Sequence, residues 1–118
     1  MALPVPGDVV TVDFPGATGL KRRPAVVVSS HLYHAHRPDV VLGVLTTQIA
    51  SASTPTDYLL QDWQAAGLNR PSAFRAYFGM SERGAVRVVG HLSERDWEGV
   101  RSCLGNAFGL EPTSHRSG

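Results

Sequence analysis

The sequence predicts a mainly β protein: a small, strongly bent β-barrel with a C-terminal α-helix packed on it and a short helix in the middle of the chain. Short apolar or alternating runs bounded by turn residues recur along the chain, as they do in small barrels. A single long amphipathic pattern stands near the C-terminal end. The chain has 118 residues, which is enough for one hydrophobic core. We therefore expect one domain over residues 1–110 and a disordered tail at 111–118 that has little to bury.

Two strands are expected first. Residues 8–14 (DVVTVDF) alternate between apolar and polar side chains, as a half-buried strand does. Residues 24–30 (PAVVVSS) carry a run of β-branched side chains that is typical of a buried strand. Residues 15–23 (PGATGLKRR) contain two glycines and three consecutive cations, so we expect a loop between the strands.

The middle of the chain predicts a second loop, a short helix and four more strands. The loop is expected at 31–38 (HLYHAHRP). Residues 61–68 (QDWQAAGL) are expected to form about two helical turns closed by Gly67, because glycine is favoured just after a helix. The strands are expected at 39–47, 57–60, 69–78 and 84–92, of which 39–47 is an apolar run long enough to cross the core.

The last element has the clearest local signals. Ser93 is a good N-cap residue and Asp96 follows three positions later. We expect the helix to end before Gly109. The apolar side chains between these limits recur at helical spacing and form one stripe: Trp97, Val100, Leu104, Ala107 and Phe108.

Charge and cysteine content narrow the classes of function. The formal net charge is only +1, which argues against a protein that coats DNA by bulk electrostatics. The basic residues are ten arginines and one lysine, a bias that suits phosphate ligands, although a G+C-rich genome would produce it too. No stretch approaches the roughly 18 consecutive apolar residues of a membrane span. The lone Cys103 is expected to be an apolar filler, and we expect a cytoplasmic protein.

Five short segments carry a family resemblance when they are taken in order. They are residues 7–15 (GDVVTVDFP), 21–29 (KRRPAVVVS), 41–48 (VLGVLTTQ), 62–75 (DWQAAGLNRPSAFR) and 89–105 (VGHLSERDWEGVRSCLG). At these spacings the chain resembles the PemK/MazF family of toxin endoribonucleases, which includes Kid. The resemblance implies an SH3-like barrel of the CcdB/Kid/MazF type that forms a homodimer. It also implies cleavage of single-stranded RNA without a metal or other cofactor, and inhibition by a cognate antitoxin.

The resemblance assigns a catalytic site to three distant residues. The family's arginine just before the strand proline corresponds to Arg23. The threonine at the end of the third long strand corresponds to Thr46, with Thr47 as the alternative if the register differs by one residue. A second arginine, in the pattern proline, serine, two residues, arginine, corresponds to Arg75. Fixed guanidinium groups suit the negative charge that develops on a phosphate when the ribose 2′-hydroxyl attacks it and leaves a cyclic phosphate and a 5′-hydroxyl.

Further residues near these three are candidates for RNA binding: Lys21, Arg22, Thr47, Gln48, Phe74 and Tyr77. Lys21 and Arg22 either position phosphates or only solvate a loop. The two aromatic residues lie beside Arg75, and single-stranded RNA is often recognised by an aromatic ring together with an arginine.

The chain departs from the family at Tyr77, where some members have an aspartate that is proposed to assist catalysis. A tyrosine there could act as a weak acid, stack on a base or simply lie on the rim. This departure keeps an alternative open: a non-catalytic or CcdB-like module that inhibits growth by binding a protein such as DNA gyrase. The C-terminal residues 115–118 (HRSG) offer no aromatic anchor for such binding, and Arg23 with Thr46 favours the enzyme.

The histidines and tryptophans are expected to be structural or solvated. His31, His34 and His36 are spaced like a ligand cluster, but no acidic or cysteine ligand accompanies them at a diagnostic spacing. We therefore expect solvated loop histidines and no metal site. His91 is expected to be structural, and Trp63 and Trp97 are expected to pack in the core.

Overall fold

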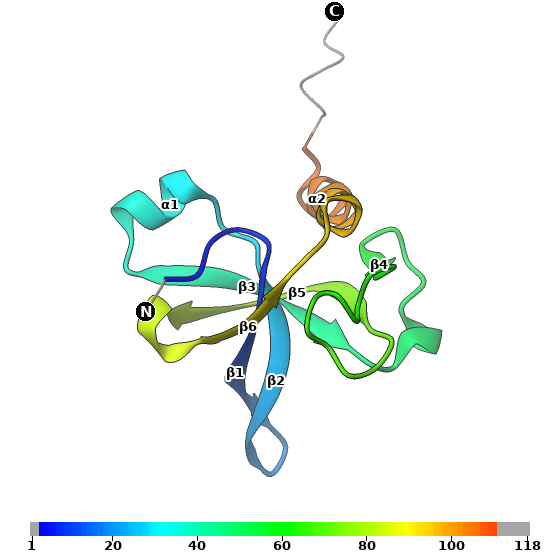
Figure 1. The fold of residues 1–118 in the computed structure, drawn as a ribbon, viewed down its shortest axis with the longest axis horizontal. Coiled ribbons are helices and arrows are strands. Elements are labelled where there is room, and N and C mark those ends of the chain that lie inside the picture. Colours follow the sequence, from blue (N-terminus) through cyan, green and yellow to red (C-terminus); the bar gives the residue numbers. More distant parts are fainter. Residues whose placement is uncertain (1–2, 111–118) are drawn as a thin grey trace, which may run out of the picture.

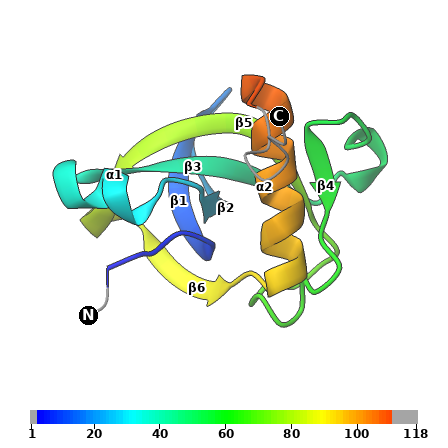
Figure 2. The same ribbon diagram turned by 90° about the horizontal axis from the view of Figure 1, so that it is seen from above.

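The computed structural model describes residues 3–110, which form one curled antiparallel sheet with a long helix packed on one face (Figures 1 and 2). The main elements are β1 (Asp8–Gly16), β2 (Gly19–Val27), α1 (His31–His36), β3 (Asp39–Thr46), β4 (Asp57–Leu59), β5 (Ala73–Glu82), β6 (Arg87–His91) and α2 (Glu94–Phe108). The strand order is β4-β5-β3-β2-β1-β6. The predicted fold class is confirmed, although in the described part of the chain β4 and β6 do not pair to close the barrel.

The sheet separates two hydrophobic clusters because successive side chains of a strand point to opposite faces. The first cluster lies under α2 and includes Val9, Val26, Leu45, Phe74 and, from the helix, Val100. The second lies on the other face and consists of Val10, Val12, Ala25, Val27, Val40 and Leu42. One face of the sheet is therefore committed to the helix, and the other face can carry a site where its apolar cluster ends.

The predicted loop at 15–23 is wrong. The residues from Gly16 to Arg23 belong to a hairpin in which β1 and β2 stay paired from Val9 and Val26 out to Gly16 and Gly19. Figure 1 shows this hairpin projecting from the body of the molecule. Its outer part buries little, so no hydrophobic periodicity marked it as a strand pair. Arg23 consequently lies within a strand, where its direction is fixed by the pleat.

The predicted loop at 31–38 is also wrong, because it contains the helix α1. Ser30 caps this helix by accepting a hydrogen bond from the Tyr33 N–H at 3.1 Å. The expectation of solvated histidines fails at His34, which is buried and hydrogen-bonded through Nε2 to Ser29 Oγ at 2.6 Å. Burial lowers the pKa of His34 by disfavouring the charged imidazolium, and the charge of Arg83 lowers it further.

The segment at 61–68 forms hydrogen-bonded turns rather than a helix, so the short helix of the fold lies at α1 instead. Gly67 adopts φ +89°, a conformation that side chains avoid, and a Cβ atom there would press on the Val89 backbone of β6. The turns thus pack closely against the free edge of the sheet. This contact explains why Gly67 stands at the position where the sequence suggested a helix end.

The helix α2 matches its prediction from cap to cap. Ser93 Oγ accepts a hydrogen bond from the Asp96 N–H at 3.3 Å, and Gly109 ends the helix in the left-handed conformation at φ 67°. Trp63 and Trp97 pack against the first cluster, and Cys103 is buried in it, as expected. No helix within residues 3–110 is long and apolar enough to cross a membrane. The tail predicted at 111–118 lies outside the described residues.

Candidate active site

The strand register brings the three predicted catalytic positions to one face of the sheet. Val44 of β3 lies opposite Ala25 of β2 on one side and opposite Arg75 of β5 on the other. Directly opposed residues of neighbouring strands share a face. Arg23 and Thr46 lie two residues further along β2 and β3 in the same direction, so they share this face with Arg75. Neighbouring strands are only about 4.8 Å apart, which makes the three residues close neighbours.

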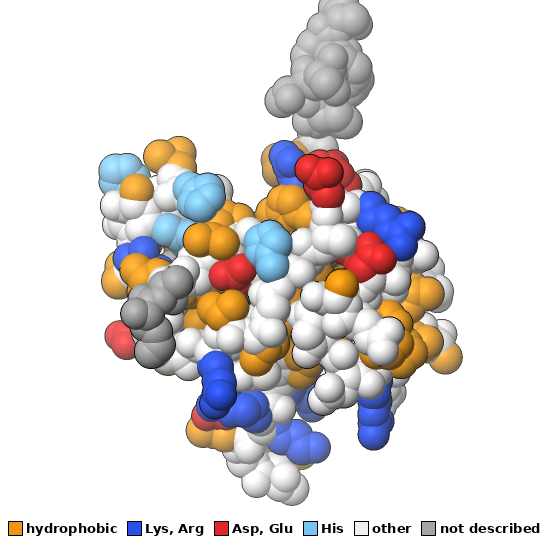
Figure 3. Space-filling model, in the orientation of Figure 1, with side chains coloured by type: hydrophobic (Ala, Val, Ile, Leu, Met, Phe, Trp, Pro, Cys, Tyr) orange, Lys and Arg blue, Asp and Glu red, His pale blue; other side chains and the backbone are white. Residues whose placement is uncertain are grey.

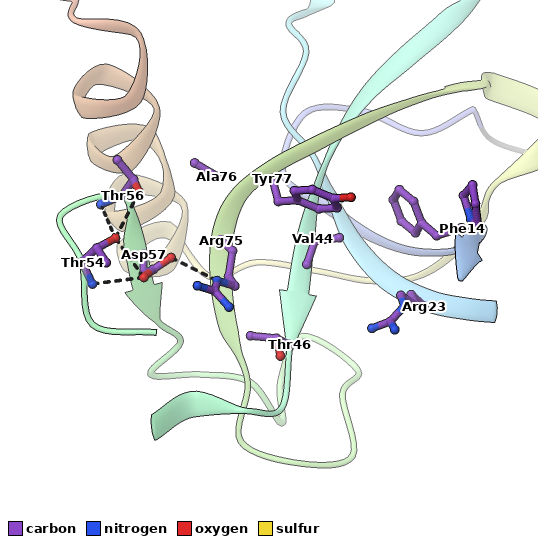
Figure 4. Close-up of a pocket in the computed structure, with 11 residues that line it drawn as sticks. Phe14, Arg23, Val44, Thr46, Thr54, Thr56, Asp57, Arg75, Ala76 and Tyr77 are labelled. Atoms are coloured by element: carbon purple, nitrogen blue, oxygen red, sulfur yellow. Dashed lines mark hydrogen bonds and ion pairs between the residues drawn. The ribbon is translucent and has the colours of Figure 1, made fainter. Parts of the chain in front are cut away.

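The three residues line one open pocket of about 690 Å³ on the face opposite α2. Figure 4 shows Thr46 between Arg75 on one side and Arg23 on the other. The remaining lining residues are Phe14, Pro15, Val44, Thr54, Thr56, Asp57, Ala76 and Tyr77. The pocket therefore offers two guanidinium groups and several hydroxyl groups, a combination suited to a phosphate ester.

A second recess of about 590 Å³ adjoins this pocket and shares Arg23 and Thr46 with it. Its lining includes four of the predicted RNA-binding residues: Lys21, Arg22, Thr47 and Gln48. Thr46 thus lines both hollows, whereas Thr47 is absent from the lining of the first. This geometry favours Thr46 over Thr47 as the partner of the two arginines.

Arg22 and Arg23 are adjacent in sequence but face opposite sides of β2. Arg22 Nε lies 3.7 Å from Asp13 Oδ1, and Arg22 Nη1 donates a hydrogen bond to Thr11 Oγ1 at 3.3 Å. Among residues 3–110 the structure gives Arg23 no hydrogen-bonding or ion-pairing side chain. Figure 3 shows basic side chains gathered around the hairpin formed by β1 and β2. The guanidinium group of Arg23 is therefore available to an anionic ligand, while that of Arg22 is partly occupied.

Thr46 lies at the end of β3 and is half-buried. Its Oγ1 accepts a hydrogen bond from the Gln48 N–H at 3.1 Å. This bond fixes the side-chain rotamer and leaves the hydroxyl hydrogen available for a donor interaction. The hydroxyl group can therefore hold an oxygen atom of a ligand in the pocket.

Arg75 has an acidic neighbour that sequence reasoning missed. Its Nε lies 3.5 Å from Oδ1 of Asp57, a residue of β4 that stands directly opposite it in the sheet. Oδ2 of Asp57 accepts hydrogen bonds from Thr54, at 3.0 Å from N and 2.9 Å from Oγ1. Burial opposes ionisation of this carboxyl group, but the Thr54 hydrogen bonds and the charge of Arg75 outweigh it and lower its pKa. Asp57 thus carries a negative charge at neutral pH.

A β-bulge sets the position of Tyr77. Val44 pairs with Arg75 and Gly43 pairs with Phe78, so Ala76 and Tyr77 are extra residues on β5. Bulges next to functional sites often redirect a side chain. The Tyr77 side chain lines the pocket and is 68% exposed, which leaves its ring accessible to a ligand.

The prediction that Phe74 binds RNA is wrong. Phe74 is completely buried in the cluster under α2, where its ring packs over Gly43. Adjacent residues of a strand point to opposite faces, so Phe74 cannot share the face of Arg75. Phe78 also turns to the helix face, where its ring stacks on Phe108 with centroids 5.3 Å apart.

The histidines outside the pocket were considered as metal ligands and as structural residues. Within residues 3–110 there is no group of three or more histidine, cysteine, aspartate or glutamate side chains that could hold a metal ion. His91 has the structural role expected of it, because its Nδ1 lies 2.8 Å from Asp8 Oδ1 and links β6 to the start of β1.

Comparison of the sequence with models of protein families gave a match over most of the chain. The model of the PemK-like, MazF-like toxin of type II toxin-antitoxin systems matches residues 5–108. The chain belongs to this toxin family. Comparison with curated protein sequences gave no match.

Solved structures support the same fold for this family member. An endoribonuclease from a mycobacterial species, in complex with its cognate antitoxin, is 22% identical over 92% of this chain and 98% of its own, with a TM-score of 0.76. Another endoribonuclease from a mycobacterial species is 20% identical over 95% and 97% of the two chains, with a TM-score of 0.70. A MazE–MazF structure from Deinococcus radiodurans is 18% identical over 94% and 100%, also with a TM-score of 0.70. At these identities the likeness concerns the fold.

Proposed function

We propose that this toxin is an endoribonuclease that cleaves single-stranded RNA by attack of a ribose 2′-hydroxyl on the adjacent phosphate. The observation that carries this proposal is the meeting of Arg23, Thr46 and Arg75 in one pocket from three different strands. Two of the similar solved structures are described as endoribonucleases, which supports the same activity. The proposed reaction needs no metal-activated water, because the RNA itself supplies the nucleophile, and the two arginines are proposed to stabilise the charge that develops on the phosphate.

The reaction makes one bond and breaks one. The 2′-oxygen forms a bond to phosphorus and loses its proton, while the bond from phosphorus to the 5′-oxygen breaks and that oxygen gains a proton. The products are a 2′,3′-cyclic phosphate and a 5′-hydroxyl. Extra negative charge develops on the phosphate oxygens during the attack, and preorganised guanidinium donors stabilise it.

The proposed roles follow from the position of each side chain. Arg23 binds the phosphate that is cleaved, since no side chain of the described residues competes for its guanidinium group. Arg75 approaches the same phosphate from β5, and Thr46 holds an oxygen atom between the two arginines. Lys21, Arg22, Thr47 and Gln48 line the adjoining recess and contact the neighbouring nucleotides.

The family also implies partners for this chain. We propose that it acts as a homodimer and that a cognate antitoxin binds it and blocks cleavage, as a complex with a cognate antitoxin is described for one similar structure. Its proposed substrate is messenger RNA, which places its action in the cytoplasm.

A cleavage assay with matched variants tests the proposal. Purified protein is expected to cut a long single-stranded RNA in the presence of EDTA. Arg23→Ala should lower the rate at least roughly 100-fold, because an electrostatic donor at the transition state is lost. Arg101→Ala is the control, since Arg101 lies on the surface of α2, outside the pocket lining, and pairs with Glu98 at 3.6 Å.

The outcomes of this assay distinguish an RNA-cleaving site at Arg23 from a protein-binding module. Loss of cutting in Arg23→Ala with full cutting in Arg101→Ala supports the site, provided that both variants melt at the temperature of the wild type. Equal cutting by Arg23→Ala and the wild type contradicts it. Growth arrest with double-strand DNA breaks and intact RNA would favour a gyrase-binding module instead.

A further inference from the structure

We propose that Asp57 is a positioning residue of this toxin, which fixes the guanidinium group of Arg75 in the pocket through an ion pair across the sheet. This inference rests on the proposed function. It assigns a role to an acidic residue of β4 that no sequence motif marked and that forms an ion pair with Arg75 of the neighbouring strand β5.

The surroundings of Asp57 show that its carboxylate is committed to protein groups. Its side chain is only 4% exposed. Oδ2 accepts two hydrogen bonds from Thr54, and Oδ1 faces Arg75 Nε. Asp57 borders the pocket, but both oxygen atoms of its carboxylate already face donors of the protein, so we assign it a positioning role and not that of the general base. A buried charge is costly unless it is paired and hydrogen-bonded, and Arg75 supplies the pairing charge.

The ion pair uses only part of the Arg75 guanidinium group. Arginine has five N–H donors in a planar fork, and the one on Nε faces Asp57. The four donors on the two Nη atoms remain for a phosphate. Arg75 is 40% exposed, so these donors can meet a ligand in the pocket. A long arginine side chain loses conformational freedom when it binds, and an anchor in the empty protein removes part of this cost beforehand.

Contacts of β4 with β5 and with α2 hold Asp57 in place. Asp57 and Arg75 are directly opposed in the register of β4 and β5. The next residue, Tyr58, points to the other face, where its hydroxyl donates a hydrogen bond to Asp96 Oδ1 at 2.8 Å and its ring packs over Gly99. The three-residue strand β4 is thus attached to α2, and the attachment presents Asp57 to Arg75.

The two arginines of the pocket consequently differ. Arg75 is held by a carboxylate before substrate arrives, while Arg23 has no such partner among residues 3–110. Position 77, two residues after Arg75, is a tyrosine, and the carboxylate that pairs with Arg75 belongs to β4.

A double-mutant cycle of RNA cleavage tests this inference. Asp57→Asn should lower kcat roughly 10- to 100-fold with KM within about twofold, because misplacement of a catalytic group slows the chemical step. In the Arg75→Ala background the same change should have no further effect. If Asp57→Asn does not fold, Thr54→Val carries the test, since it removes one hydrogen bond to Oδ2 and keeps the charge. It should give a smaller loss of kcat that also vanishes in Arg75→Ala.

A second readout does not depend on activity. The Nε–Hε signal of Arg75 in a ¹⁵N-correlated NMR spectrum, assigned by its loss in Arg75→Ala, should exchange slowly with water in the wild type and fast in Asp57→Asn. Asp13→Asn is the matched control, because Asp13 pairs with Arg22 and should leave the Arg75 signal unchanged.

The outcomes distinguish this inference from the proposed function. A wild-type protein that cuts no RNA contradicts the proposed function, and the NMR signal then decides whether Asp57 holds Arg75. If the rate loss of the double variant equals the product of the losses of Asp57→Asn and Arg75→Ala, the positioning role is overturned. It is also overturned if Asp57→Asn leaves the Arg75 signal unchanged.

Discussion

At the scale of single residues, the direction of a side chain decides which cations can serve the pocket. Arg22 and Arg23 have the same chemistry and are neighbours in sequence, yet they point to opposite faces of β2. Arg22 meets Asp13 and Thr11, whereas Arg23 lines both the pocket and the adjoining recess. Sequence reasoning could identify Arg23 only through the family pattern, because a run of three cations has no internal signal that separates one from the next.

The difference between these two arginines makes a prediction. Arg22→Ala should slow cleavage much less than Arg23→Ala, by roughly tenfold or less, because an exposed, partly paired cation contributes weakly. Initial rates on the same RNA at two or more salt concentrations would measure the ratio. Comparable losses in the two variants would mean that the hairpin acts through its total charge and that the strand faces have no separate roles.

Tyr77 makes a second prediction at this scale. Its ring is exposed on the pocket and is suited to stacking on a base. Tyr77→Phe should keep the affinity for RNA, and Tyr77→Ala should weaken it by about 1–3 kcal/mol, the usual contribution of one stacked base. Binding of an RNA oligonucleotide with 2′-deoxy sugars, which cannot be cut, measures this. A large loss of cleavage rate in Tyr77→Phe would instead show that the hydroxyl group takes part in the reaction.

At the scale of elements, hydrogen bonds to Asp96 of α2 join this helix to β4 and to the turns at 61–68. Asp96 is completely buried and accepts hydrogen bonds from the Tyr58 hydroxyl at 2.8 Å, the Gln61 N–H at 2.9 Å and the Asp62 N–H at 2.8 Å. A carboxylate can accept all three bonds, because both of its oxygen atoms are acceptors. An asparagine amide has one oxygen atom, and its NH2 group would face an N–H or O–H donor of the protein. This junction carries β4, and with it Asp57, to the site.

Replacement of this buried carboxylate tests the junction. Asp96→Asn should lower the free energy of unfolding by about 2–4 kcal/mol, because it leaves buried donors without an acceptor. Urea denaturation followed by circular dichroism would measure the change. Glu98→Gln on the exposed side of the same helix is the control and should change stability by less than about 0.5 kcal/mol. Equal stability of Asp96→Asn and the wild type would contradict this account of the junction.

Asp62 gives the junction a dependence on pH. Hydrogen bonds from Arg95 and Ser93 lower the pKa of this carboxyl group to about 2, below its ordinary value of 3.8. A carboxyl group whose pKa is lower in the folded state stabilises the fold above its unfolded pKa, and this contribution is lost as the pH falls. Stability should therefore decline between pH about 4 and 2. Asp62→Asn should make this decline shallower in thermal unfolding scans, and an unchanged slope would exclude the residue as its source.

The elements that could be predicted from sequence are those that bury a regular apolar pattern. The strands β2 and β3 and the helix α2 each direct apolar side chains into a cluster, so periodicity revealed them. The outer hairpin and α1 bury little and were missed, although Ser30 was a cap signal that could have indicated the helix. Asp57 could not be found, because an ion pair across two strands depends on register and has no characteristic spacing along the chain.

At the scale of the whole molecule, the two faces of the sheet differ: one packs against α2 and the other carries the pocket. The helix covers one face and completes the larger cluster, while the opposite face ends in the pocket and its adjoining recess. Figure 2 shows α2 lying across the strands on its own side of the sheet. Both faces therefore contribute a buried cluster, and the proposed substrate site lies only on the face opposite α2.

Binding of RNA by the pocket and its adjoining recess should depend on salt despite the low net charge. If three or four of the cations Lys21, Arg22, Arg23 and Arg75 neutralise phosphates, the logarithm of the binding constant should fall with the logarithm of salt concentration with a slope of roughly −2 to −3. Titration of an uncleavable oligonucleotide in EDTA at several salt concentrations measures the slope. A slope near zero would contradict phosphate binding by these residues.

The chemistry of the cleaved ends tests the central claim most directly. RNA cut by the purified protein in EDTA should be mapped by primer extension and its new ends identified. We expect discrete cleavage sites with 5′-hydroxyl ends and 2′,3′-cyclic phosphates, and no cutting where the nucleotide before the broken bond has a 2′-deoxy sugar. Cleavage that leaves 5′-phosphate ends, or that proceeds at a 2′-deoxy position, would contradict the attack of a ribose hydroxyl in the pocket of Arg23, Thr46 and Arg75.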